Sequence, residues 1–444
     1  MAFYDTSTAE IDNILLTNSN GTDSKDMKDV FLEMSYYEDI TLPSISATVL
    51  MSDASGYLND FPIVGDEDLT LTFKTRGFDY LEGIDVNLRS YKVGQKVRIS
   101  DRAISYPIEF TTKVALEDPK TTVNSFYEGR VDDIVRKLGQ LGNFEMPFSI
   151  EATDGLYEYV ATQDTVFETI SKLRKEAKSL THPSSAFVFY QNRFTYNFVT
   201  LNFLFKQPVR PFRDFYYTFQ NRINNTEIPP SNIISNLEQI QSNDIIDGMR
   251  NGLFGNEVLA IDPLRKATNL TEFDYFADGF KKTGPHLADD ENENQQAARV
   301  QPTLSSLARN SQRANRNYLI SDLKNTSPRS YIPQNSARED IYLRAKHQFL
   351  GNRISLAEQA NSFAIRITIP GNSSIRVGEC INIYMPDASG FNLNRYDKYL
   401  HGKYLVTTAR HNIRTDGLYE TVLECIKDSF ESQITATLGT PQIL

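Results

Sequence analysis

The sequence contains no tryptophan, two cysteines and five histidines in 444 residues. Cys380 and Cys425 are too few for a disulfide framework or a zinc site, and each lies in a strand-like stretch, so we expect two buried free thiols. No stretch approaches the ~20 apolar residues of a membrane span. Residues 1–13 lack the basic and apolar regions of a signal peptide. Together these absences predict a soluble protein that is not exported.

The chain is acidic, with 57 Asp and Glu against 46 Lys and Arg and a net charge of -11. Such a surface repels phosphate, which argues against a large nucleic-acid-binding face, although an acidic lining that DNA passes without sticking is compatible with it. The 27 Phe and 23 Tyr suit strand-rich packing. At about 150 residues per domain, the length indicates about three domains.

A turn-into-strand phrase occurs near both ends of the chain. Residues 64–71 and 93–99 each place a valine and a glycine before alternating polar and apolar residues, and residues 377–384 repeat the phrase. We expect each glycine to adopt a positive φ in a turn that enters a half-buried strand. The glycines are Gly65, Gly94 and Gly378. The sequence therefore predicts two β modules, and it leaves open which early glycine corresponds to Gly378.

The first β module is expected at residues 30–116, after an N-terminal arm of residues 1–29. Alternating apolar residues predict two strands joined by a turn at residues 41–43, and therefore a hairpin within a barrel or sandwich. The predicted strands are 30–36, 44–51, 69–74, 97–100 and 108–115.

An inserted α+β domain is expected at residues 117–200. A helical apolar pattern ends at Gly142, and Thr165 with Glu168 forms a capping box that opens a second helix. The predicted elements are helices at 131–141 and 165–177 and a hairpin of 186–190 with 194–198.

The second β module is expected to begin at residues 201–235 and to resume at residues 338–430, before a C-terminal tail of residues 431–444. An irregular insert of residues 236–337 separates its two parts. Within this insert, residues 289–316 are polar and lack apolar periodicity, which predicts a long loop or arm. Its arginines, from Arg299 to Arg316, could bind an acidic partner or only keep the arm soluble. A helix is predicted at 338–350 and strands from 362 to 426.

We predict no catalytic, cofactor-binding or metal-binding residues and no enzymatic activity. Asp132 with Asp133 and Asp289 with Asp290 are adjacent acidic pairs, but neighbours on a helix point different ways and the second pair lies in a polar loop, so solvated charge explains both. The glycines lack the spacing of phosphate-binding loops. The histidines lack metal-ligand spacing and are expected at the surface or half-buried. They are His182, His286, His347, His401 and His411.

Three blocks of the sequence carry distinctive phrases: Leu42-Pro43-Ser44, Ser52-Asp53-Ala54-Ser55-Gly56, Phe61–Glu67, Thr165–Ala177, Ala186–Arg193, Tyr196-Asn197-Phe198, Ile369-Pro370-Gly371, Arg376–Glu379, His401–Val406 and Tyr419–Glu424. Taken in order, these blocks resemble the central baseplate hub protein of contractile-tailed bacteriophages, a tail-tube-like hub family. The early and late blocks are similar to its two tube-like domains, and the middle block is similar to its outward-projecting domain. The likeness covers nearly the whole chain, and residues 213–337 contribute little to it.

This resemblance implies an α+β, mainly β fold, with two tail-tube-like antiparallel β-barrel domains, an inserted α+β domain and a long irregular insert. It implies a homotrimer whose six barrels match the hexameric tail tube above and the trimeric central spike below, with a channel for DNA ejection. The implied partners are the spike protein, the first tube ring, the baseplate wedge proteins and genomic DNA that passes without specific binding; contact with the tape-measure protein stays open. The implied location is the virion, after assembly in the host cytoplasm. The alternatives are a tail-associated peptidoglycan hydrolase and a cell-surface carbohydrate-binding protein.

Overall fold

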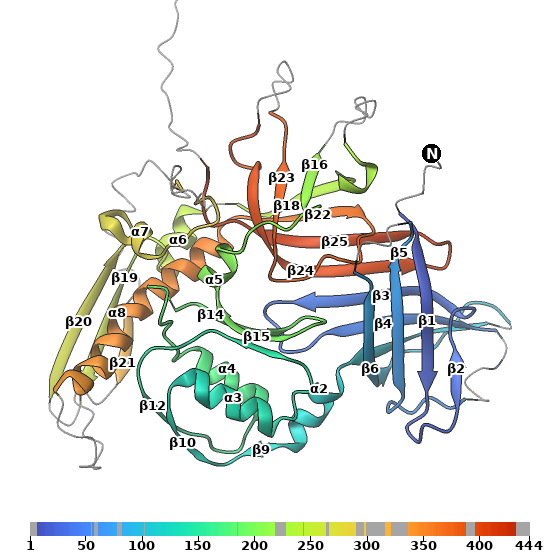
Figure 1. Ribbon diagram of the computed structural model, residues 1–444, viewed down its shortest axis with the longest axis horizontal. Helices are drawn as coiled ribbons and strands as arrows, with labels where there is room; N and C mark the ends of the chain where they lie inside the picture. The colour runs from blue at the N-terminus through green and yellow to red at the C-terminus, as the bar shows by residue number, and fades with distance from the viewer. Residues whose placement is uncertain are drawn as a thin grey trace, which may run out of the picture.

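The computed structural model describes residues 7–431 except 55, 57–60, 78–81, 102, 184, 218–227, 243, 263–265, 290–296, 299–315, 321–335 and 388–395. Strands dominate the molecule, and most of them join one curled sheet. Two further lobes adjoin this sheet: a helical one around α3 and α4, and a smaller one around β19–β21 and α8 (Figure 1). None of the described helices combines the length and the apolar character needed to cross a bilayer.

The first β module forms one half of the curled sheet, with the strand order β3-β4-β8-β6-β5. Every second residue of β4 and β5 is buried, as expected for strands with one face on a core. The predicted hairpin is confirmed, because β3 and β4 pair antiparallel across the turn. The strands are β3 (Phe31–Asp39), β4 (Ser46–Asp53), β5 (Asp68–Thr75), β6 (Ile84–Val93), β7 (Val97–Arg98) and β8 (Ile104–Thr111).

Three details of this module differ from the expectation. Within residues 1–29, β1 (Ala9–Thr17) and β2 (Ser24–Asp26) extend the sheet beside β5, because buried Ile14 and Leu16 complete the core. The strand expected at 108–115 ends at Thr111, since the Thr112 hydroxyl caps α2 (Lys113–Glu117). Strand β6 was not predicted, although its apolar residues alternate.

The second β module has the strand order β18-β22-β25-β24-β23-β16-β17. The long strand β24 joins the two modules, because its residues 408–414 pair antiparallel with β3. The sheet therefore runs without a break from one module into the other (Figure 1). The strands are β16 (Asp214–Tyr217), β17 (Ile233–Ile234), β18 (Asn236–Gln241), β22 (Ala364–Pro370), β23 (Cys380–Tyr384), β24 (Gly402–Arg414) and β25 (Tyr419–Ile426), with a 3-10 turn η3 (Pro230–Asn232) before β17.

The two modules repeat one plan, since β3-β4-β8-β6-β5 matches β18-β22-β25-β24-β23 in order. In each, a buried glutamate directly precedes the matching strand β5 or β23, and its carbonyl accepts a backbone hydrogen bond: Ser90 N–H to Glu67 at 2.8 Å and Val406 N–H to Glu379 at 3.0 Å. Both β6 and β24 then carry a bulge, at Tyr91 and Thr407.

The turn glycines settle which early phrase is the counterpart of Gly378. Gly65 and Gly378 have φ of +98° and +81°, whereas Gly94 is not among the positive-φ glycines. The expectation for Gly94 was therefore wrong. Gly94 is needed for a close approach instead, because a Cβ there would lie 2.5 Å from Pro107 Cγ. Gly65 is thus the counterpart of Gly378.

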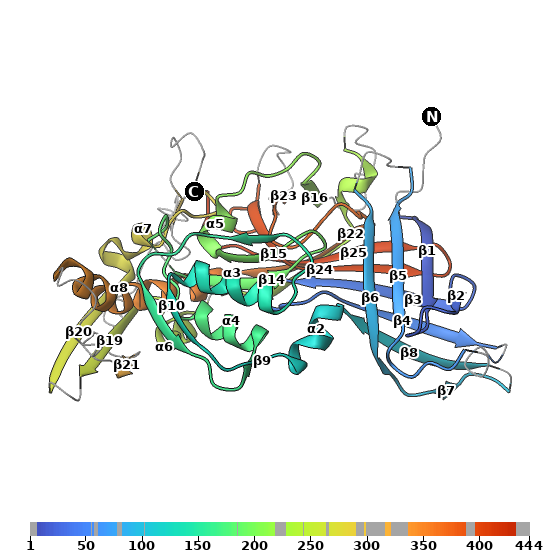
Figure 2. The ribbon, with the colours of Figure 1, turned by 60° about the horizontal axis from the view of Figure 1, so that its bottom comes forward.

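The α+β insert has the predicted helices and hairpin. α3 (Val131–Leu141) stops at Gly142, and the capping box of Thr165 and Glu168 opens α4 (Val166–Arg174). Both helices lie beside the hairpin of β14 (Phe187–Gln191) and β15 (Tyr196–Thr200), to which β11 (Phe148–Ile150) adds in parallel (Figure 2). The other elements are η1 (Asp118–Lys120), β9 (Thr122–Val123), β10 (Phe126–Gly129), β12 (Tyr157–Val160), β13 (Asp164–Thr165) and α5 (Leu201–Phe205).

The segment expected to be irregular, residues 236–337, contains regular elements. Its first strand, β18, belongs to the main sheet, and a separate sheet has the order β20-β19-β21. The helix predicted at 338–350 is confirmed and continues to Asn361 as α8 (Ser336–Asn361). The arm predicted at 289–316 lies almost wholly outside the described residues. The elements are α6 (Ile245–Asn251), β19 (Gly255–Asp262), β20 (Ala267–Asp274), η4 (Tyr275–Gly279), α7 (Phe280–Lys282) and β21 (Arg316–Ile320).

Candidate functional site

The three parts of the chain meet at a buried polar junction, which is the candidate site. Its centre is Glu38, at the end of β3, which is 0% exposed. The Glu38 carboxylate accepts hydrogen bonds from the Tyr36 hydroxyl at 2.9 Å, the Arg193 N–H at 3.3 Å and the Val377 N–H at 3.1 Å. One carboxylate therefore ties the first module to the α+β insert and to the second module.

Burial raises the pKa of Glu38, although the positive charge of Arg193 and the hydrogen bonds favour the charged form. Arg193, in the turn between β14 and β15, is 5% exposed and donates from its guanidinium to the carbonyl of Ser373. Thr75 of the first module donates to the Gly371 carbonyl at 3.1 Å. The turn before β23 is thus bound by both the α+β insert and the first module.

A buried ion pair fixes the same turn from the other side. Arg213, just before β16, donates to Glu379 at 2.7 Å and to the Ser374 carbonyl at 2.9 Å. Because this ion pair is buried and Arg213 also binds a backbone carbonyl, the pair favours a single arrangement of the parts rather than adding much net stability. The junction is therefore suited to hold the modules at a fixed angle.

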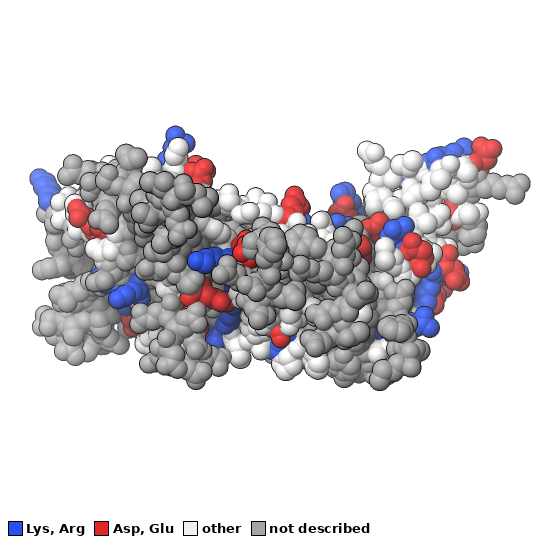
Figure 3. Space-filling view, turned by 90° about the horizontal axis from the view of Figure 1, so that it is seen from above, with Lys and Arg blue, Asp and Glu red and all other residues white. Residues whose placement is uncertain are grey.

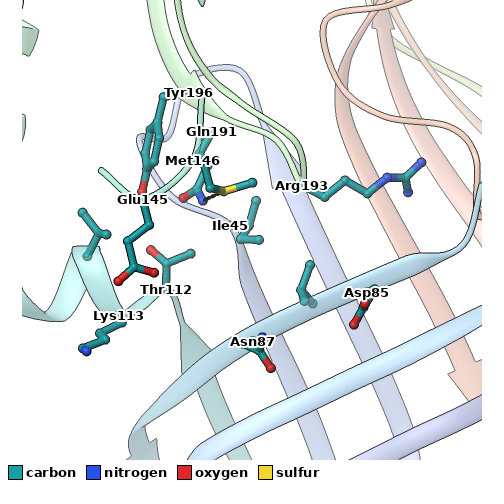
Figure 4. Close-up of a pocket in the computed structure, with 12 residues that line it drawn as sticks. Ile45, Asp85, Asn87, Thr112, Lys113, Glu145, Met146, Gln191, Arg193 and Tyr196 are labelled. Carbon is teal, nitrogen blue, oxygen red and sulfur yellow. Dashed lines mark hydrogen bonds between the residues drawn. The ribbon is translucent and has the colours of Figure 1, made fainter. Parts of the chain in front are cut away.

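A cavity of about 240 Å³ lies between the first module and the α+β insert, next to this junction. Asp85 and Asn87 of β6 line one side, and Glu145 and Tyr196 of the insert line the other. Figure 4 shows the Arg193 guanidinium directed away from these side chains. Asp85 and Asn87 already accept hydrogen bonds from Thr72 and Thr70.

The two cysteines behave as predicted, since Cys380 in β23 and Cys425 in β25 are free and buried. Two histidines do not. His286 is buried with its Nδ1 2.7 Å from Asp428 Oδ2, and His411 is buried with its Nδ1 2.9 Å from the Tyr419 hydroxyl. Their partners come from elements distant in sequence or across the sheet, so local spacing gave no signal.

The pKa values of these histidines move in opposite directions. Burial lowers the pKa of His286, but the Asp428 carboxylate, the Phe280 carbonyl and Asp289 together outweigh burial, and the net shift is upward. Burial, with the charge of Arg193, lowers the pKa of His411 to about 3. His182 and His401 are half-buried, and burial lowers the pKa of both. The side chain of His347 lies outside the described residues.

The acidic pairs also differ in part from the expectation of solvated charge. Asp132 is buried and accepts from the Thr153 hydroxyl at 2.6 Å, whereas Asp133 is exposed and pairs with Arg136 at 3.2 Å. Asp289 accepts from the His286 N–H at 2.7 Å, and Asp290 lies outside the described residues. Within the described ranges, no group of three or more His, Cys, Asp or Glu could hold a metal ion.

Charged side chains of both signs are interspersed on the face seen from above. Figure 3 shows Lys and Arg beside Asp and Glu on the described atoms of this face, rather than one patch of a single sign. Such a face does not present the basic stripe expected of a nucleic-acid-binding surface.

No protein-family model and no curated protein matches this chain. Solved structures do match it over nearly its full length. The tail protein from Neisseria meningitidis MC58 aligns with a TM-score of 0.52 at 10% identity, covering 95% of this chain and 96% of the other. The 43 kDa tail protein of prophage MuSo2 from Shewanella oneidensis aligns with a TM-score of 0.50 at 9% identity, covering 94% and 98%. The chain therefore has the mainly β fold of phage tail proteins, as the sequence predicted.

Proposed function

We propose that this protein is the structural hub of a contractile phage tail baseplate. Three chains form a pseudo-sixfold ring that joins a trimeric spike to the hexameric tail tube and leaves a channel for DNA ejection. The observation that carries the proposal is the repeated module: one chain presents the same five-stranded plan twice in one continuous sheet. Three such chains would present six equivalent units to a sixfold tube.

The buried junction supports this role. A ring adapter needs its two modules at a constant angle, and Glu38, Arg193 and the Arg213–Glu379 pair hold the parts together without a hinge. As part of the same proposal, we retain the division into two tube-like domains and an outward-projecting α+β domain. The proposed role is structural rather than enzymatic, and the proposed location is the virion, after assembly in the host cytoplasm.

The proposed partners follow from the ring. They are the central spike, the first ring of tube protein and the surrounding wedge proteins, with the tape-measure protein as a further contact to be tested. Genomic DNA would pass through the channel without binding, because an acidic lining repels it. A channel lined mainly by Lys and Arg, or tight salt-dependent DNA binding in solution, would contradict this part.

Light scattering and electron microscopy of the purified chain test the proposal. The expected result is a trimeric ring with a central channel. A soluble monomer at micromolar concentration would contradict it and would reopen the hydrolase and carbohydrate-binding alternatives. Assays on peptidoglycan and on surface carbohydrate then separate those two alternatives from each other.

A further inference from the structure

The repeated plan predicts where a second copy of the chain binds. Within the chain, β24 pairs with β23 as far as Leu405. Beyond that point the same edge of β24 pairs with β3, at Thr408–Arg414. In the first module, β6 likewise pairs with β5 as far as Arg89. Among the described residues, no strand pairs with this edge of β6 beyond Ser90. The equivalent edge of the first module is therefore open.

The matching bulges fix the correspondence between the two edges. Lys92 pairs with Glu109 directly after one bulge, and Thr408 pairs with Glu424 directly after the other. Gly94 donates to the Pro107 carbonyl at 2.7 Å, at the position where Arg410 pairs with Val422. Residues from 92 onward thus occupy the place that residues 408–414 take in the second module.

The strand that would complete this edge is β18. Just as β3 is the outer neighbour of β4, β18 is the outer neighbour of β22, and β22 is its only described partner. The edge of β3 that faces away from β4 pairs with β24. Among the described residues, no strand pairs with the corresponding edge of β18.

Burial differs sharply between the filled junction and the open one. Val64, in the turn beside the open edge, is 80% exposed. Near the ends of the two edges, Ile413 is 0% exposed and Val97 is 60% exposed. In β18, Ile240 is 44% exposed. Both open edges therefore carry exposed apolar residues.

The charges of the two open edges are opposite. Exposed Lys92, Lys96 and Arg98 lie along the first. Exposed Glu238 lies in β18, and exposed Asp244 and Asp247 follow at the start of α6. Opposite charges of this kind favour one edge finding the other and disfavour two identical edges meeting.

Resting on the trimer of the proposed function, we propose that residues 92–98 of one copy pair antiparallel with β18 of the next copy. The contact repeats between chains what β24 and β3 do within a chain. It joins two different edges head to tail, so it generates a closed ring when the rotation closes. The occupant of each open edge is therefore a second copy of this chain.

Cysteine cross-linking tests the pairing, because Cys380 and Cys425 are buried and leave the surface free of thiols among the described residues. A mixture of Lys96→Cys and Glu238→Cys chains, treated with a short bismaleimide, should give a covalent dimer, while neither variant alone should. The double variant should give a covalent trimer. As a matched control, Asp26→Cys on β2 replaces Glu238→Cys, since it is also an exposed acid on an edge strand.

Light scattering on the same samples separates the two proposals. Trimers that cross-link through Lys96→Cys and Glu238→Cys but not through Asp26→Cys support the pairing. Trimers that do not cross-link at these sites overturn the pairing and leave the proposed hub intact. Monomers overturn both. Cross-linked assemblies that are not trimers support the edge pairing and overturn the trimeric hub.

A charge reversal provides a second measurement. Lys96→Glu places an acid opposite Glu238 and should raise the apparent dissociation constant of the trimer about tenfold. Lys25→Glu, on β2, changes the charge equally and should leave association unchanged. Equal effects of the two substitutions would overturn the pairing.

Discussion

Gly378 packs directly against Tyr190: a Cβ on Gly378 would lie 2.1 Å from the Tyr190 hydroxyl oxygen. Gly378 also has φ of +81°, so both its conformation and its surroundings require glycine. Its counterpart Gly65 has a similar conformation, but its nearest neighbour would be 3.8 Å away. The repeat therefore supplies two glycines with similar positive φ that differ in crowding.

Gly378→Ala should destabilise the protein more than Gly65→Ala. Strain at positive φ costs each variant about 1 to 2 kcal/mol, and the contact with Tyr190 adds ~1 to 3 kcal/mol at Gly378 only. Gly378→Val should cost still more and should impair ring formation. Urea unfolding of the alanine variants measures the difference, and equal midpoints would contradict the close approach. A Gly378→Val variant with unchanged stability and normal trimer yield would contradict the turn assignment.

Glu38→Ala should loosen the junction. It leaves the Tyr36 hydroxyl and two backbone N–H groups without their acceptor, and each unpaired buried donor costs about 1 to 3 kcal/mol. Tyr36→Phe removes only one of these bonds and serves as the milder control. Hydrogen exchange should show faster exchange at Arg193 and Val377 in Glu38→Ala. Unchanged exchange at both amides would argue against Glu38 as the tie between the parts.

The Arg213–Glu379 pair should behave as a unit. Glu379→Gln leaves the buried Arg213 charge alone and should destabilise by about 3 to 5 kcal/mol. Arg213→Met should cost less, because Arg210 Nη1 remains 3.6 Å from Glu379 Oε2. The double variant should be more stable than the sum of the two losses predicts, because no unpaired charge remains. Thermal unfolding of all four proteins checks this, and strictly additive losses would rule out direct coupling.

Stability should fall as the pH drops from about 6.5, and His411 should cause part of the fall. Its folded pKa is lowered to about 3, whereas the unfolded histidine titrates near 6.5. Below about 6.5 the unfolded state therefore binds an extra proton, which favours unfolding. His411→Asn should flatten the dependence between pH 7 and 5.

His286 supplies the opposite sign. Its raised folded pKa contributes stability below the unfolded value and loses that contribution as the pH rises through the folded pKa. His286→Asn should therefore remove the gain in stability that the protein makes as the pH falls toward about 6.5, and should leave the slope below that pH unchanged. His411→Asn should instead flatten the slope below about 6.5. The same direction of change in both variants would contradict the two assignments.

Cys380 and Cys425 should not react with a thiol reagent in the folded protein. Burial raises the pKa of Cys380 to about 12 and that of Cys425 further, so almost no thiolate forms near neutral pH. Ellman's reagent should detect no thiol under native conditions and two after denaturation. Rapid native labelling of either cysteine would show that the second module opens.

Local patterns determined many elements of this fold. The Thr165–Glu168 capping box, the helix that ends before Gly142 and the alternating strands depend on neighbours within a few residues, so the sequence alone located them. Strand β6 shows the same alternation, and β1 shows it in its C-terminal half, so the signal was available for both. The helix at 336–361 was placed correctly but was predicted to end too early.

Only the tertiary structure decided the roles of groups whose partners are distant in sequence. Glu38 meets Arg193, and His286 meets Asp428, through contacts that no local spacing encodes. Gly94 lies in the same Val-Gly sequence pattern as Gly65. Its role is nevertheless set by its close approach to Pro107 across the sheet rather than by its own φ. The sequence thus determined the strands and turns by periodicity and backbone preference. The order of the strands, the junction and the two open edges depend on long-range pairing, which only the folded chain specifies.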